Sequence, residues 1–136
     1  MRFLRFLILF VLLIVLSGCN TSDNDNGEIL KLLATRTNAL NSKDISRYIS
    51  VISLNYSDKG KNFSQLKESI SRNFSQYETL AYEADSPEIT INGKRAESSC
   101  SYRLKLKTNG REITLNGVER LELIRETAGW RIIAGI

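Results

Sequence analysis

Residues 92–107 read NGKRAESSCSYRLKLK, and this stretch decides the fold. From Arg95 to Lys107, apolar or small residues alternate with polar or charged ones. One set comprises Ala96, Ser98, Cys100, Tyr102, Leu104 and Leu106. A period of two is typical of a strand with one buried and one solvated face. Asn92-Gly93 just before it is a strong hairpin-turn signal. The stretch therefore predicts a long strand inside an antiparallel sheet.

Other strands are expected on both sides of this one. Asn109-Gly110 marks a second hairpin turn, and Pro87 suits the start or edge of a strand. The expected strands are residues 79–84, 88–92, 95–107 and 112–126, with a last strand that starts at Trp130. The sequence predicts a sheet of four to five antiparallel strands.

Upstream of the sheet the apolar residues recur with the 3.6 period of amphipathic helices. Asn62 with Gln65 resembles a capping box at the start of the third helix. The expected helices are residues 28–40, 44–53 and 63–75. This order predicts an α+β fold in which three helices cover one face of the sheet.

The first 19 residues have the layout of an export signal. Arg2 and Arg5 precede an uninterrupted apolar run over residues 6–16, which is the pattern of a secretory signal peptide. A membrane-spanning helix needs roughly 20 apolar residues, about twice the length of this run. The pattern therefore favours an export signal over a transmembrane anchor.

The apolar run ends at Leu16-Ser17-Gly18-Cys19, which resembles the lipobox of bacterial lipoproteins. The resemblance implies a diacylglyceryl group on the Cys19 thiol and cleavage between Gly18 and Cys19. The alternative is an unmodified cysteine after an ordinary signal peptide. A diacyl anchor supplies the two chains that stable membrane attachment requires. We therefore expect residues 1–18 to be a signal peptide and the membrane to be a partner through the lipid on Cys19.

The resemblance also implies a location in the bacterial cell envelope. In Gram-negative lipoproteins, an aspartate after the lipidated cysteine tends to retain the protein in the inner membrane, and Asn20 stands there in this chain. The expected location is the outer membrane, facing the periplasm, in a Gram-negative host. In other hosts it is the outer face of the cytoplasmic membrane.

The segment after the lipobox is wholly polar and predicts a flexible tether. Residues 19–27 are expected to be the lipidated cysteine and the tether, and residues 28–136 a single domain. Loss of residues 1–18 lowers Lys+Arg from 19 to 17 while Asp+Glu stays at 15, so the mature charge is +2. Nucleic-acid binding thereby loses its main support. The basic stripe Arg103, Lys105 and Lys107 is expected to be solvated, with anionic lipid head groups as the alternative partner.

The chain has no His and two Cys, which excludes several classes of function. Ser-His and Cys-His nucleophiles are excluded, as are imidazole metal ligands. With Cys19 acylated, Cys100 has no intramolecular disulfide partner and is expected to be a small buried strand residue. We expect no cofactor, no metal site and no catalytic residue.

The order and size of the elements over residues 28–136 resemble the nuclear transport factor 2-like superfamily, also called cystatin-like. The local cues are the segment NALNSKD at 38–44, Tyr56, and Gly129-Trp130-Arg131-Ile132. The resemblance implies a strongly curved sheet wrapped around helices to form a cone, often with a pocket. The alternative is an α+β meander without a curved cone. The catalytic motif of relatives such as ketosteroid isomerase cannot be placed on this sequence.

Polar residues on the apolar sheet face are the candidates for lining such a pocket. Glu119 falls between Gly117 and Leu121 on that face, where a carboxylate is desolvated unless it is paired. The interpretation we favour is a β-bulge near Asn116-Gly117 that sends Glu119 to solvent or to Arg103. The candidate pocket residues are Tyr56, Tyr82, Ser98, Cys100, Tyr102 and Glu119.

Together these patterns predict a membrane-anchored, non-enzymatic envelope lipoprotein that is a monomer or weak dimer. Its domain would bind a small apolar ligand or a protein partner. One alternative is a structural or accessory module of an envelope complex without a pocket. Another is a His-free isomerase or hydrolase that uses Glu119 and a Tyr. A cavity distinguishes the first two, and the third requires Glu119 to be buried within hydrogen-bond reach of a Tyr hydroxyl.

Overall fold

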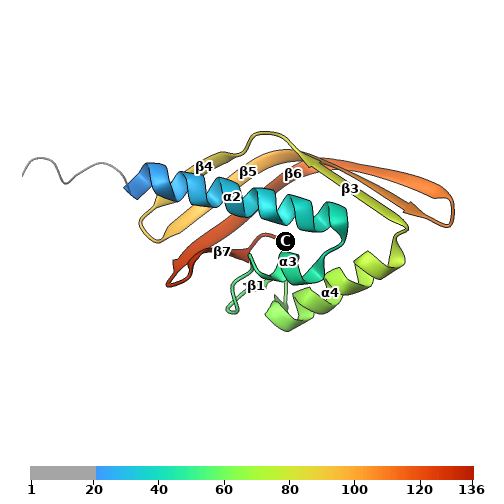
Figure 1. Cartoon of the computed structure of the whole chain (residues 1–136), viewed down its shortest axis with the longest axis horizontal. Helices are drawn as coiled ribbons and strands as arrows, with labels where there is room; N and C mark the ends of the chain where they lie inside the picture. The colour runs from blue at the N-terminus through green and yellow to red at the C-terminus, as the bar shows by residue number, and fades with distance from the viewer. Residues whose placement is uncertain (1–20) are drawn as a thin grey trace, which may run out of the picture.

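The structure is a computed structural model that describes residues 21–136. Its helices are α2 (Thr21–Ser42), α3 (Ile45–Ile49) and α4 (Phe63–Gln76). Its strands are β1 (Ser57–Asp58), β2 (Lys61–Asn62), β3 (Thr79–Ala84), β4 (Glu88–Asn92), β5 (Arg95–Thr108), β6 (Arg111–Glu126) and β7 (Gly129–Ala134). The helices lie along one side of the curved sheet (Figure 1). The signal peptide, the lipobox and Asn20 lie outside the described residues.

The main sheet is antiparallel and is built around β5. Its order is β3-β5-β6-β7, and β4 pairs with β5 beside β3. The strand predicted from the alternating pattern thus pairs with three neighbours, β3, β4 and β6. The expected α+β fold of three helices and a four- to five-strand antiparallel sheet is confirmed.

The prediction of a flexible tether is wrong for residues 21–27, because α2 begins at Thr21. Asp25 is only 5% exposed. It accepts a hydrogen bond from Nε1 of Trp130 at 3.2 Å and lies 2.6 Å from Nη1 of Arg125. These contacts fasten the first turns of α2 to β6 and β7, and they override the weak helix propensity of a run rich in Asn and Asp.

Helix α3 is shorter than the expected 44–53. Asp44 caps its start, because Oδ1 accepts a hydrogen bond from the backbone N–H of Arg47 at 2.9 Å. Past Ile49 the chain joins the sheet instead, since Ile52 bridges to Ile132 in β7. The predicted capping box of α4 is confirmed: Asn62 and Gln65 bond each other's backbone N–H groups at 3.0 and 2.9 Å.

The core lies between the helices and the sheet. Trp130 is buried together with Ile29, Tyr48, Leu123 and Ile132. The C-terminal end of α2 is held to β3 by a two-way amide contact. Nδ2 of Asn41 donates to the carbonyl of Tyr82 at 3.0 Å, and its Oδ1 accepts from the Tyr82 N–H at 2.6 Å. This contact fixes Tyr82, and the site is built around it.

Candidate functional site

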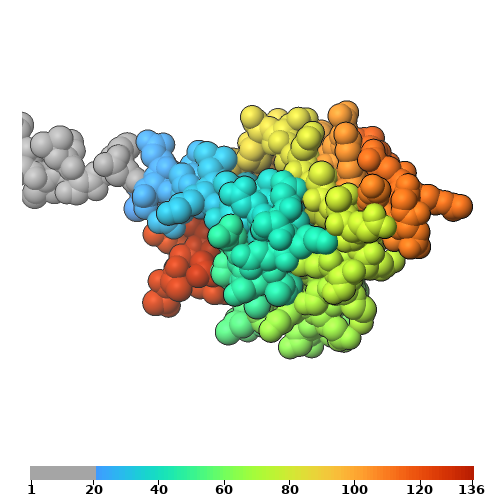
Figure 2. Space-filling model, turned by 45° about the vertical axis from the view of Figure 1, so that its right-hand side comes forward, coloured from blue at the N-terminus to red at the C-terminus, as the bar shows by residue number. Residues whose placement is uncertain are grey.

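A cavity of about 950 Å³ lies between α2, α4 and the concave side of the sheet. Figure 2 shows the helical side of the molecule, with the β5–β6 hairpin projecting beyond the helices. Most of the wall is aliphatic or aromatic. Its apolar and aromatic members are Leu40, Tyr48, Ile70, Phe74, Tyr77, Leu80, Tyr82, Tyr102, Leu104, Leu106, Leu115, Val118, Ala134 and Ile136.

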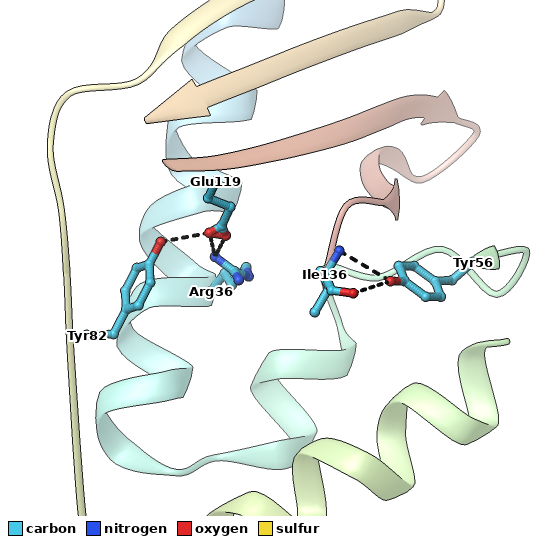
Figure 3. A network of polar contacts seen from close by, with 5 residues as sticks. All are labelled: Arg36, Tyr56, Tyr82, Glu119 and Ile136. Carbon is cyan, nitrogen blue, oxygen red and sulfur yellow. Dashed lines mark hydrogen bonds and ion pairs between the residues drawn. The ribbon is translucent and has the colours of Figure 1, made fainter. Parts of the chain in front are cut away.

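A buried ion pair lies in this wall (Figure 3). The other polar and charged residues that line the cavity are Asp58, Lys59, Asn73, Arg120 and Glu122. Nη1 of Arg36 lies 2.8 Å from Oε1 of Glu119 and donates a hydrogen bond to Oε2 at 3.0 Å. The Tyr82 hydroxyl donates a second hydrogen bond to Oε2 at 2.8 Å. The side chains of Arg36 and Glu119 are only 9% and 10% exposed. A pair that is this buried is strongly coupled, because little water screens it.

Two aromatic rings flank the guanidinium. The Cζ atom of Arg36 lies 5.8 Å from the ring centroid of Tyr48 and 5.5 Å from that of Tyr82. Both distances fall within the range of cation–π attraction. The cluster therefore surrounds one positive charge with one carboxylate and two electron-rich rings.

Burial and charge set the proton affinities of the cluster. Burial alone would lower the pKa of Arg36, but the neighbouring Tyr48, Glu119 and Tyr82 outweigh it and raise that pKa above its ordinary value. Burial is also the main reason that the pKa of Tyr82 is raised; Arg36 opposes the shift and Glu119 adds to it. Arg36 is therefore a fixed cation, and Tyr82 is a neutral hydrogen-bond donor at physiological pH.

The predicted β-bulge near Asn116-Gly117 is wrong. The β5–β6 register runs unbroken through Cys100↔Glu119 and Tyr102↔Gly117, so Glu119 stays on the concave face. Arg103 does not reach Glu119; its Nε donates to Oδ1 of Asn116 at 3.3 Å. The Tyr102 ring lies over Gly117, so this position in the ladder favours a residue without a side chain. A Cβ at Gly117 would come within 3.0 Å of that ring.

The pocket residues predicted from sequence fall into three groups. Tyr82, Tyr102 and Glu119 line the large cavity, where the Tyr82 and Tyr102 rings stack with centroids 5.9 Å apart. Ser98 and Cys100 instead line a second cavity of about 210 Å³. Arg36, Tyr82 and Glu119 line both, so the polar cluster forms a wall between the two cavities.

Tyr56 lines neither cavity. Its hydroxyl donates to the carbonyl of Ile136 at 3.2 Å and accepts from the Ile136 N–H at 3.3 Å (Figure 3). Burial raises the pKa of this hydroxyl. The candidate assignment of Tyr56 to the pocket is therefore wrong, because its side chain anchors the segment after β7.

Cys100 is half-buried on β5 and forms no disulfide among residues 21–136. Burial, followed by the charge of Glu119, raises the pKa of its thiol. A thiol with a raised pKa is a weak nucleophile at neutral pH. The sequence predicts a small buried strand residue; Cys100 does lie on a strand, but it is half-buried rather than buried.

Sequence reasoning missed Arg36 and Tyr48. Arg36 follows Leu32 by four residues and precedes Leu40 by four, so it lies on the apolar stripe of α2. The sequence signal that could have identified the pair was one charged residue, Arg36, on an apolar helix stripe together with one carboxylate, Glu119, on the apolar sheet face. The Tyr48 hydroxyl and Nε of Arg36 are both buried without a hydrogen-bond partner among the described residues.

Residues 21–136 contain neither a metal-binding cluster nor a membrane-spanning helix. No group of three or more His, Cys, Asp or Glu side chains in this range is arranged to hold a metal ion. No helix in this range is long and apolar enough to cross a membrane.

Comparisons with known proteins place the fold. No protein-family model and no curated sequence matches the chain. A nuclear transport factor 2-like protein of Salmonella enterica superposes with a TM-score of 0.76 at 17% identity, covering 83% of this chain and 89% of that one.

Two proteins of Novosphingobium aromaticivorans are also similar in structure. One has a cystatin-like fold and superposes with a TM-score of 0.67 at 18% identity. The match covers 82% of this chain and 79% of that protein. The other is a candidate scytalone dehydratase, which superposes with a TM-score of 0.76 at 7% identity. The match covers 85% of this chain and 83% of that protein. Residues 21–136 therefore have the nuclear transport factor 2-like, cystatin-like fold.

Proposed function

We propose that the domain binds a small, uncharged, largely apolar molecule in the large cavity. The observation that carries this proposal is the combination of about 950 Å³ of space with a wall made mostly of apolar and aromatic residues. Binding sites for small molecules typically span roughly 300–1,000 Å³ and have apolar walls with few polar groups. A purely structural module would fill this space with side chains.

The polar cluster selects against charged ligands. Arg36 and Glu119 neutralise each other at 2.8 Å, and Tyr82 completes the shell of the carboxylate. Next to this pair, a charged ligand group would have to break the pair or remain without a counter-charge, and both are unfavourable. The charged residues Asp58, Lys59, Arg120 and Glu122 line other parts of the wall. An uncharged polar group near Arg36 and Tyr48 meets no such barrier.

The proposed function is non-enzymatic. The chain has no His, and the carboxylate of Glu119 is engaged by Arg36 and Tyr82 at the same time. Binding uses the space and the shape of the cavity, whereas general-base catalysis requires a freer carboxylate.

Native mass spectrometry tests ligand binding. The lipidated protein is purified from its own host and compared with two variants, Leu115→Trp and Ile113→Trp. Both positions lie on the same face of β6 and are 46% exposed, but only Leu115 lines the cavity. We expect a retained small molecule in the parent protein and in Ile113→Trp, with much lower occupancy in Leu115→Trp. Equal occupancy in both variants would contradict the proposal.

We also propose that Cys19 carries the lipid anchor and places the domain in the cell envelope. The support is the match at Leu16-Ser17-Gly18-Cys19 after the apolar run. Growth of the host with an alkyne-bearing palmitate should label the parent protein and Cys100→Ser, but not Cys19→Ser. Labelling of Cys19→Ser, or no labelling of the parent, would refute this assignment.

One contact favours a second candidate function, acid–base catalysis. The Tyr82 hydroxyl lies 2.8 Å from Oε2 of buried Glu119, the geometry that this alternative requires. The retained molecule would then exchange a C–H proton with solvent. Deuterium uptake from D2O by the bound molecule, lost in Glu119→Gln with occupancy unchanged, would establish catalysis. No uptake in the parent protein would support binding alone.

A further inference from the structure

The sequence leaves little chain between the proposed lipid and the folded domain. Only Asn20 separates Cys19 from Thr21, the first residue of α2. Two residues span at most about 7 Å even when fully extended. The following inference rests on the proposed lipidation of Cys19. Once that lipid is in a membrane, the start of α2 is confined to within about this distance of the lipid head groups.

The start of α2 is itself fixed to the domain. Asp25 is buried against Trp130 and paired with Arg125, and Ile29 one turn later is fully buried. Removing one partner of such a buried contact is costly, because the other is left without compensation. The first turns of α2 therefore do not act as a hinge, and the position of the anchor determines the position of the whole domain.

Three chain segments meet at this end of the molecule. Figure 1 shows the first turn of α2, the β4–β5 turn and the β6–β7 turn together at one end, with the β5–β6 turn at the opposite end. We call the first three the anchor end: residues 21–25, 92–95 and 126–129. Arg36, on the cavity wall, is 15 residues along α2 from Thr21, about 22 Å at the rise of an α-helix.

We propose that the anchor end docks on the surface of the lipid bilayer and holds the domain end-on. The cavity then stands away from the head groups, and the β5–β6 turn is the part of the domain farthest from the membrane. The competing surface is the basic stripe Arg103, Lys105 and Lys107, on the sheet face opposite the helices. Docking through that stripe would lay the sheet flat on the bilayer.

Fluorescence quenching in vesicles tests the orientation. The full lipidated chain, in a Cys100→Ser background, carries a single dye-labelled cysteine at Thr90→Cys or at Thr114→Cys. Both threonines are exposed and share the face of the basic stripe, because they pair with Glu97 and Lys105. These partners are eight residues apart on β5, about 26 Å. The vesicles contain phosphatidylethanolamine, phosphatidylglycerol and a small fraction of lipid with a nitroxide head group.

The matched control inserts a flexible Gly/Ser linker of about 20 residues between Asn20 and Thr21, with a mean reach of about 25 Å. We expect several-fold stronger quenching at position 90 than at position 114, and loss of this difference in the linker variant. Equal quenching at both positions without the linker would overturn the end-on orientation and point to the basic stripe. Failure to float with the vesicles would refute the lipid anchor itself, and the orientation with it.

Discussion

Removing Arg36 should destabilise the domain far more than removing a similar pair at the surface. In Arg36→Met the Glu119 carboxylate stays buried and keeps only the Tyr82 hydroxyl. Breaking a buried pair from one side costs about 3–5 kcal/mol. With a urea m-value of about 1.5 kcal/mol/M, a loss of about 4 kcal/mol moves the unfolding midpoint down by roughly 2–3 M.

The chain offers a matched control and a rescue. Nη1 of Arg72 lies 2.7 Å from Oε1 of Glu68, but these side chains are 67% and 68% exposed. Arg72→Met should leave the midpoint within experimental error, since exposed pairs contribute little. The double variant Arg36→Met/Glu119→Leu removes both charges and should recover most of the lost stability, because well-packed apolar residues often replace a buried pair without loss.

The assay is urea unfolding followed by far-UV circular dichroism. It is applied to these three variants and to Glu119→Leu, the single variant that completes the double-mutant cycle. A coupling free energy of about 3 kcal/mol is expected between Arg36 and Glu119. If Arg36→Met unfolds at the parent midpoint, or if the double variant loses the sum of the two single losses, the pair is not coupled as described.

Four further predictions concern other parts of the molecule. Tyr82→Phe removes the hydrogen bond to Glu119 and should lower the free energy of unfolding by about 1.5–3 kcal/mol. Because the folded-state pKa of Tyr82 is raised, the unfolded chain loses this proton first, so stability falls as pH rises above about 10; this fall should be shallower in Tyr82→Phe. Cys100 should react slowly with a maleimide in the native state and rapidly in urea; rapid native labelling would contradict its raised pKa and partial burial. Gly135→Ala should lower Tm strongly, because its Cβ would clash with the Arg120 carbonyl oxygen, whereas Gly110→Ala, also at positive φ but in open space, should cost less. Asp25→Ala should increase hydrogen exchange in the first turns of α2, since Trp130 and Arg125 lose their shared partner; unchanged exchange there would mean that these contacts do not hold the helix.

The strands were predictable because their signal is local. The alternation across residues 95–107 and the turns at Asn92-Gly93 and Asn109-Gly110 depend only on neighbours in sequence. The observed β5 and β6 accordingly differ from the expected ranges by one residue at one end each. The capping box at Asn62 and Gln65 is local in the same way.

The misses all involve contacts between distant parts of the chain. Residues 21–27 have the composition of a tether, and their helix is held by the contact of Asp25 with Trp130, 105 residues away. Glu119 stays inside because it meets Arg36, 83 residues away. Single-sequence patterns show that each charge is unusual in its place. They do not show that the two charges meet, because that depends on how α2 lies across the sheet.

The most direct test of the central claim, an accessible apolar cavity beside the Arg36–Glu119 pair, is a fluorescence titration with the uncharged probe N-phenyl-1-naphthylamine. The titration uses delipidated parent protein with Leu115→Trp and Ile113→Trp alongside. The account predicts saturable binding at one site per chain, weakened many-fold in Leu115→Trp and unchanged in Ile113→Trp. Non-saturable binding, or equal binding by the two variants, would contradict it.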